Sequence, residues 1–121
     1  MSKAALSVLT FGVYALITGI GLALAPQLLL APFGIPSPTA VWVRVAGAVV
    51  INVGVLYIVA AKSESRAFFA ASIPTRALIL VWFSAFVVLQ WVSPALLVFG
   101  LLDAIAAAWT WSALRADRRG A

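Results

Sequence analysis

The chain of 121 residues contains no cysteine and no histidine, and only 9% of its residues are charged. The absence of both residue types excludes thiol chemistry, disulfides and Cys/His ligands for zinc or haem. It also removes the side chain that most often transfers protons near neutral pH. The sequence further lacks a Ser/His/Asp set, paired carboxylates and a nucleotide-binding loop. We therefore predict no metal site, no cofactor and no catalytic residue.

Acidic residues are scarce, with three against eight Lys and Arg, and the net charge is +5. Such a balance can indicate nucleic acid binding, but here the basic residues flank apolar runs, as they do in membrane proteins. We therefore expect no nucleic-acid partner. The flanking residues are Lys3, Lys62, Arg66, Arg76, Arg115, Arg118 and Arg119.

Hydrophobic residues make up 65% of the chain, which is far above the usual share in soluble domains. A membrane-spanning helix needs roughly 20 mostly apolar residues. Four windows meet this requirement and leave no room for a soluble domain. They predict an all-α fold, an integral membrane antiparallel four-helix bundle, as one domain over residues 1–121. The windows are Ala5–Ala25, Ala40–Ala61, Pro74–Val92 and Pro94–Leu114.

Prolines divide the chain between these windows. Proline is tolerated in the first turn of a helix, so Pro38, Pro74 and Pro94 predict helix starts. Residues 63–72 are then expected to lie along the interface as a short amphipathic piece. The apolar segment 26–39 contains four prolines, which prevent a continuous helix. It is typical of an interfacial or partly re-entrant element that covers one end of the bundle.

Basic residues also predict the orientation. They lie in the N-terminal segment, in residues 62–76 and in the C-terminal tail, whereas the connections at 26–39 and 93–94 hold none. Positive charge stays on the cytoplasmic side of a membrane. The sequence therefore predicts a multi-pass protein of a bacterial inner membrane, with both termini cytoplasmic and one orientation.

Asp103 is the only acid inside an apolar run, and a charge at that depth usually faces the protein interior and often marks a site. Helical rise predicts a layer of polar side chains near the bilayer centre, one from each helix. Their depths from the outer ends are ~14 Å for Asp103, ~16 Å for Asn52, ~12 Å for Ser84 and ~10 Å for Thr18. Arg44, at ~5 Å, and Gln90, shallower still, complete the candidate ligand-binding set.

Helical spacing indicates which way these side chains point. On the last helix Gly100, Asp103 and Thr110 share a face with small residues, which favours close helix packing, so Asp103 is expected to point inward. On the second helix Arg44, Ala48 and Asn52 follow at steps of four, with Gly47 and Gly54 beside them. Arg44 is the expected charge partner of Asp103. Arg76 is expected to extend to the headgroups instead.

Three interpretations of this polar cluster stay open. The side chains could only fix helix register through mutual hydrogen bonds, form a pocket, or meet a partner membrane subunit or a second copy. The leading hypothesis is a membrane accessory or binding protein that takes a lipid or small hydrophobic molecule. The alternative is a small transporter or channel in which Asp103 responds to protons or cations. An enzyme acting on a lipophilic substrate is the least favoured.

The pattern Arg44-Val-Ala-Gly47, followed by Gly54, Tyr57 and Ala60-Ala61, occurs with Gly100-Leu-Leu-Asp103 in the last helix. In these residues and in its layout the chain resembles the DoxX-like or BphX-like group of small four-span bacterial proteins. The resemblance implies a membrane accessory protein and no particular reaction.

Overall fold

The computed structural model describes residues 1–34 and 41–120, and within them it contains helices and no strand. Four of the helices are long and apolar enough to cross a membrane, as the composition predicts. A short helix and a 3-10 turn follow the first of these four helices, and another 3-10 turn precedes the last. In chain order the elements are α1 (Lys3–Leu24), α2 (Pro26–Leu30), η1 (Ala31–Phe33), α3 (Val41–Lys62), α4 (Arg66–Val88), η2 (Pro94–Leu96) and α5 (Leu97–Arg119).

The start of α4 corrects the sequence prediction. The helix begins at Arg66, and Pro74 lies inside it rather than in its first turn. Residues 66–72 are therefore part of α4 and do not form a separate interfacial piece. Proline removes one backbone hydrogen bond, but membrane helices tolerate it because neighbouring groups can satisfy the freed carbonyl. The predicted start at Pro38 lies outside the described residues.

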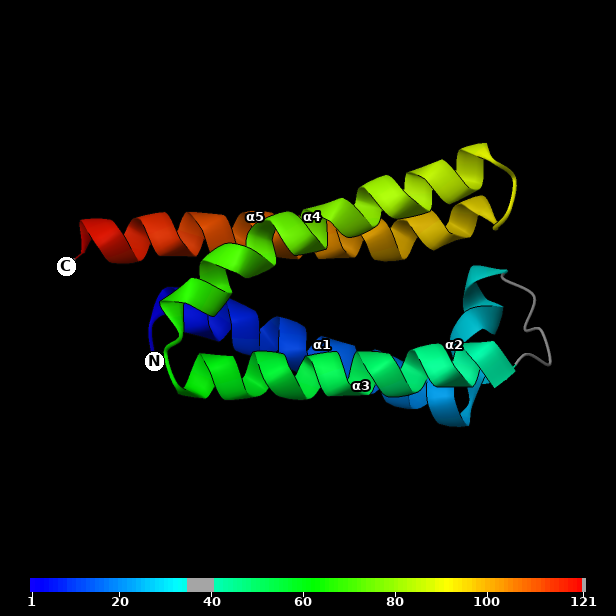
Figure 1. Ribbon diagram of the computed structural model, residues 1–121, viewed down its shortest axis with the longest axis horizontal. Helices are drawn as coiled ribbons and strands as arrows, with labels where there is room; N and C mark the ends of the chain where they lie inside the picture. The colour runs from blue at the N-terminus through cyan, green and yellow to red at the C-terminus, as the bar shows by residue number, and fades with distance from the viewer. Residues whose placement is uncertain (35–40, 121) are drawn as a thin grey trace.

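The long helices form two antiparallel pairs, α1 with α3 and α4 with α5 (Figure 1). Contacts between α1 and α5 join the pairs, whereas α3 and α4 touch little. The pairs lie close together at the end that holds both termini and separate toward the other end (Figure 1). A buried apolar cluster fills the terminal end, so the space between the pairs opens only beyond it. Its members are Ala4, Ala5, Val8, Tyr57, Ala61, Phe69 and Ala113.

Glycines bring α1 and α3 into backbone contact at two levels. A methyl group added to Gly12 would lie 3.0 Å from the carbonyl oxygen of Gly54. A methyl group added to Gly19 would lie 2.8 Å from the carbonyl oxygen of Gly47. Small residues at such interfaces let membrane helices approach closely, where van der Waals packing replaces the hydrophobic effect. These four glycines therefore fix the face of α3 that turns toward α1.

Two acidic side chains outside the apolar runs fasten the start of α1. Glu64 accepts hydrogen bonds from the backbone N–H and the hydroxyl of Ser2, both at 2.7 Å. Asp117 accepts from the backbone N–H groups of Lys3 and Ala4, at 3.2 and 3.0 Å. Carboxylates at a helix N-terminus satisfy free N–H groups and complement the helix dipole. The bonds from Ser2, first from its hydroxyl and then from its amide, hold the pKa of Glu64 below its ordinary value.

The only non-glycine residues with positive φ in the described ranges are Glu64 (53°) and Gln90 (61°), which end α3 and α4. At each place two backbone bonds form the pattern of a Schellman motif. Trp91 N–H donates to the Phe86 carbonyl at 2.9 Å, and Gln90 N–H donates to the Val87 carbonyl at 3.0 Å. Gln90, which the sequence places in the ligand-binding set, thus lies exposed in a turn.

We expect Gly19→Ala to lower the free energy of unfolding by about 1–3 kcal/mol, because the methyl group overlaps the α3 backbone. It would lie 2.7 Å from the Ile51 nitrogen, and backbone cannot move aside. The matched control is Gly21→Ala in the same helix, whose methyl meets only the Leu29 side chain, at 3.3 Å. This control should leave stability unchanged or raise it, because alanine favours the helix. Thermal unfolding in detergent measures both, and equal effects would contradict the close α1–α3 contact.

We expect Gln90→Gly to stabilise the protein by on the order of 1 kcal/mol, because glycine adopts a left-handed conformation without steric cost. The same exchange at Gln27, which is exposed inside α2, should not stabilise it. Thermal unfolding of the two variants distinguishes these cases. A loss of stability in Gln90→Gly would contradict the assigned turn.

Candidate functional site

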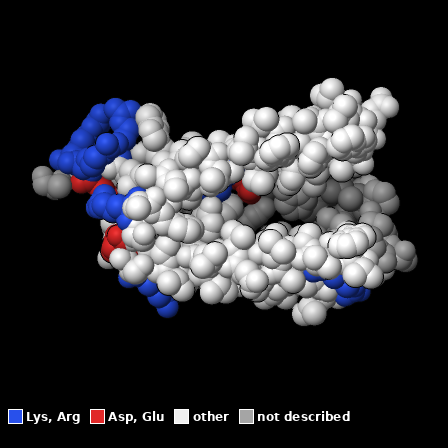
Figure 2. Space-filling model, in the orientation of Figure 1, with Lys and Arg blue, Asp and Glu red and all other residues white. Residues whose placement is uncertain are grey.

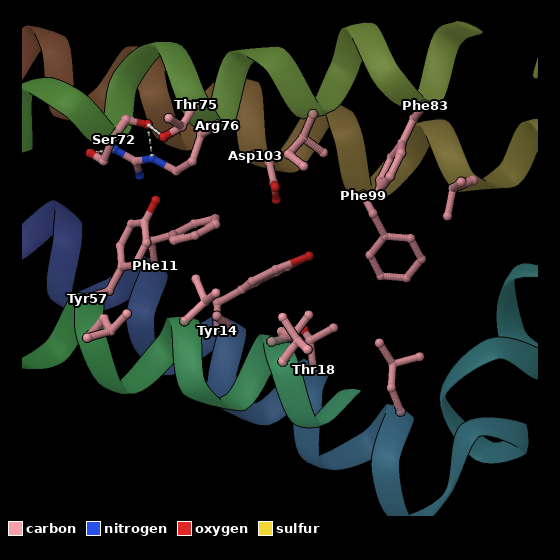
Figure 3. A pocket seen from close by; sticks show the side chains of 18 of the residues that line it. Phe11, Tyr14, Thr18, Tyr57, Ser72, Thr75, Arg76, Phe83, Phe99 and Asp103 are labelled. Carbon is pink, nitrogen blue, oxygen red and sulfur yellow. Dashed lines mark hydrogen bonds between the residues drawn. The ribbon is translucent and has the colours of Figure 1, made fainter. Parts of the chain in front are cut away.

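A cavity of about 660 Å³ lies between the two helix pairs and receives side chains from all four long helices (Figure 3). Most of its lining is apolar, including Phe83 and Phe99 at the wider end. Clefts of this size and character are typical of sites for small molecules. The polar lining residues are Tyr14, Thr18, Tyr57, Ser72, Thr75, Arg76 and Asp103.

Arg76 is the central polar residue of this cavity, and its side chain is only 2% exposed. It lies ten residues into α4, about 15 Å along the helix from its start. Its Nε donates to the Ser72 carbonyl at 3.1 Å and one terminal nitrogen donates to the Ser72 hydroxyl at 2.9 Å. Both contacts lie one turn back along α4 (Figure 3), so they hold the guanidinium against its own helix.

The same guanidinium nitrogen donates to the Thr110 hydroxyl of α5 at 2.7 Å. Thr110 and Ser7 of α1 are hydrogen-bonded at 2.8 Å, and Ser7 donates to the Ala4 carbonyl at 2.7 Å. Since Ser7 has a single hydroxyl hydrogen, Thr110 must be the donor to Ser7. This chain of buried bonds connects α4, α5 and α1, the helices that hold the two pairs together.

Aromatic rings surround the rest of the guanidinium. Its carbon lies 4.9 Å from the centre of the Phe11 ring and 5.5 Å from that of the Tyr57 ring. Such contacts attract a cation electrostatically, and more strongly where water is excluded. The second terminal nitrogen of Arg76 is buried and has no hydrogen-bond partner within the described residues. Part of the donor capacity of Arg76 is therefore unused.

Asp103 enters the cavity from α5, with its carboxylate directed into the open space (Figure 3). It is half-buried and accepts no hydrogen bond from any residue in ranges 1–34 and 41–120. Tyr14 extends across the cavity below it (Figure 3). The predicted inward face of α5 is confirmed, because Gly100 and Thr110 are buried while Ile105 is 65% exposed. One cavity thus holds a cation and an acid that do not satisfy each other by direct contact.

The cavity is closed at its terminal end by the apolar cluster around Phe69 and Tyr57. Toward the other end Leu29 and Leu30 of α2 line it, and the Phe33 ring packs on Phe99 with centroids 5.0 Å apart. On the face formed by α3 and α4 the surface is hollowed, and charge of both signs is visible within an otherwise uncharged middle (Figure 2). In the described part of the predicted 26–39 element, α2 and η1 cover this end of the cavity, which opens sideways. Residues 35–39 lie outside the described residues.

The structure brings together only part of the predicted polar layer. Asp103 and Thr18 line the cavity, but Asn52, Ser84 and Gln90 do not. Asn52 is exposed on the opposite side of α3 from Gly47 and Gly54. The prediction that these side chains form one polar layer is therefore wrong for Asn52 and Ser84. The depth of a residue along its helix does not specify the rotation of the helix about its axis, which decides where the side chain points.

Arg44 is not the charge partner of Asp103. It is exposed and donates to the carbonyl oxygens of Ala23 and Leu24, at 2.7 and 3.4 Å. A cation at a helix C-terminus satisfies free carbonyls and complements the dipole, so Arg44 caps α1. The prediction that Arg76 reaches the headgroups is also wrong. Arg76 follows Ser72 by four residues, a spacing that places the two side chains on one face of a helix and so could indicate their hydrogen bond. A helix start at Pro74 would leave Ser72 outside the helix, and the spacing then has no such meaning.

Comparison of the chain with protein-family models, with curated proteins and with solved structures finds no match. The site therefore has to be interpreted from its own geometry.

We expect Thr110→Val to lower the free energy of unfolding by about 1–3 kcal/mol, because it removes one of the two acceptors of a buried guanidinium nitrogen and the donor to the Ser7 hydroxyl. The matched control is Thr10→Val on α1, where the exposed hydroxyl only donates to the Leu6 carbonyl of its own helix. That exchange should change stability by less than about 0.5 kcal/mol. Thermal unfolding compares them, and a neutral Thr110→Val would contradict the bond chain.

Proposed function

We propose that this multi-pass protein lies in a bacterial inner membrane as an antiparallel four-helix bundle with both termini in the cytoplasm. The support is the distribution of charge along the helices. Six Lys and Arg residues lie near the terminal end, whereas Arg44 lies near the other end and Arg76 lies between them. Figure 2 shows most of the visible basic side chains gathered at the terminal end. Such asymmetry orients membrane proteins with the positive side inward.

We further propose that the protein binds an amphipathic lipid or small hydrophobic molecule between its helix pairs. The observation that carries this proposal is the cavity of about 660 Å³, apolar over most of its lining, with Arg76 and Asp103 on its wall. Its opening between α3 and α4 would face the acyl chains of the bilayer. A lipophilic molecule could then enter from the membrane without crossing water.

The polar wall indicates how such a ligand would be held. Asp103 offers carboxylate oxygens without a partner among the described residues, and the buried guanidinium of Arg76 adds positive charge to the same wall. A ligand group that donates a hydrogen bond, such as a hydroxyl or a protonated acid, would satisfy Asp103. Buried polar groups are costly when unpaired, so this end of the ligand should contribute most of the specificity.

The geometry favours binding over transport. A conducting path needs polar access from both sides, but the buried cluster around Phe69 and Ala61 closes the cavity toward the terminal end. Transport that uses Asp103 as a proton-responsive group would require this cluster to open. Among the described lining residues no nucleophile is paired with a base, so the geometry favours binding over an enzymatic step as well.

Filling the cavity should displace the ligand. We expect Val53→Trp, at a lining position of α3, to lower the amount of co-purifying lipid or hydrophobe. The indole ring would occupy space that the ligand needs, and fitting both into the cavity would cost about 1–3 kcal/mol. The matched control is Val81→Trp on α4, which is 60% exposed and does not line the cavity. Native mass spectrometry of protein released from bilayer nanodiscs measures the bound species.

The same measurement on Asp103→Asn and Asp103→Leu tests the polar wall. We expect the leucine variant to lose more ligand than the asparagine variant, which keeps hydrogen-bonding atoms. Equal occupancy in the wild type, Val53→Trp and Val81→Trp would exclude this cavity as the binding site. An absence of any bound species in the wild type would exclude the function itself.

A further inference from the structure

Asn52 lies on the outer side of α3, where nothing in the described structure accounts for its amide. The side chain is exposed and makes no hydrogen bond with residues 1–34 or 41–120. The buried side of the same helix carries Gly47, Gly54 and Tyr57. Asn52 is ten residues from Lys62, about 15 Å along the helix, so it lies near the middle of the span.

A lone amide at this depth is unfavourable. Hydrocarbon offers no water to satisfy its donors and acceptor, and each unsatisfied group costs free energy. Asparagine near the middle of a helix is also too short to reach the headgroups. Its amide therefore requires a polar partner from outside the described chain.

The neighbouring residues show what kind of partner fits. Asn52 belongs to a row of residues spaced alternately by three and four, and every member is exposed. This spacing forms the contact seam between helices in a coiled coil. A single asparagine within such a seam sets register and oligomeric state. The row, named here the α3 seam, consists of Val45, Ala48, Asn52, Val55 and Val59.

We propose that two copies of this chain associate in parallel through the α3 seam, with the two Asn52 amides hydrogen-bonded to each other. A carboxamide both donates and accepts, so it is complementary to itself. The charge distribution inserts every copy in one orientation, which places both Asn52 residues at the same depth. A two-fold axis along the membrane normal then brings each seam residue against its own copy.

The α3 seam and the cavity use different sides of the helix. The seam faces away from Gly47 and Gly54, whereas Val49 and Val53 line the cavity on a flank between the two sides. Two copies can therefore associate while the cavity stays accessible. The inference depends on the proposed membrane insertion but not on ligand binding, so either proposal can fail alone.

Disulfide cross-linking in lipid bilayers tests the geometry, because the chain contains no cysteine and single-cysteine variants are unambiguous. We expect Ala48→Cys and Val55→Cys to form covalent dimers on oxidation. The matched controls are Val81→Cys on α4 and Ile105→Cys on α5, at sites 60% and 65% exposed, which should stay monomeric. Equal cross-linking at all four positions, or none at the seam, would overturn the proposal.

Energy transfer between labelled copies of the full chain in liposomes then tests the amide. We expect Asn52→Val to raise the dimer dissociation constant by about tenfold, which corresponds to the loss of one interhelical hydrogen-bond pair. Its thermal unfolding as a monomer in detergent should be unchanged, because the side chain has no partner within the described chain. Asn52→Gln should restore part of the association. An unchanged dissociation constant in Asn52→Val, or no energy transfer between wild-type copies, would overturn the proposal.

Discussion

The arrangement of the helices depends on one buried cation. Arg76 lies in the middle of α4, 2% exposed, and a charge at that depth is tolerated only with polar partners inside the protein. Ser72 supplies two of them on α4, and Thr110 supplies a third on α5. Ser7 continues the chain into α1. The need to satisfy one guanidinium thus connects three of the four long helices at a single level.

The cavity follows from the way the pairs are joined. Glycines hold α1 and α3 in backbone contact, and Gly100 lets α5 approach Leu80 and Phe83 of α4. Contacts between α1 and α5 join the pairs, but α3 and α4 barely touch and leave a lateral opening. Arg76 and Asp103 share the resulting space without a hydrogen bond between them. Its polarity on one wall and apolar lining elsewhere suit an amphipathic molecule.

Much of the fold could be predicted from the sequence, because runs of apolar residues and their length determine where a chain can cross a membrane. The inward direction of Asp103 also follows from small residues at steps of three and four on α5. Two features could not be predicted in this way. Pro74 predicts a helix start, but it lies inside α4, because surrounding structure can accommodate proline inside a membrane helix, and the burial of Arg76 depends on the longer helix. The direction of Asn52 depends on the rotation of α3, which is set by the contacts of Gly47 and Gly54 with α1.

The burial of Arg76 can be measured directly by nitrogen-15 NMR of arginine side chains in the full-length protein in nanodiscs, with Arg76→Lys used to assign the signal. A guanidinium held by Ser72 and Thr110 should give resolved Nη–H resonances that exchange slowly with water, whereas the arginines at the helix ends should exchange fast. Slow exchange for Arg76 alone is the predicted result. Fast exchange equal to that of the other arginines would show a hydrated side chain and would contradict the buried network on which the cavity depends.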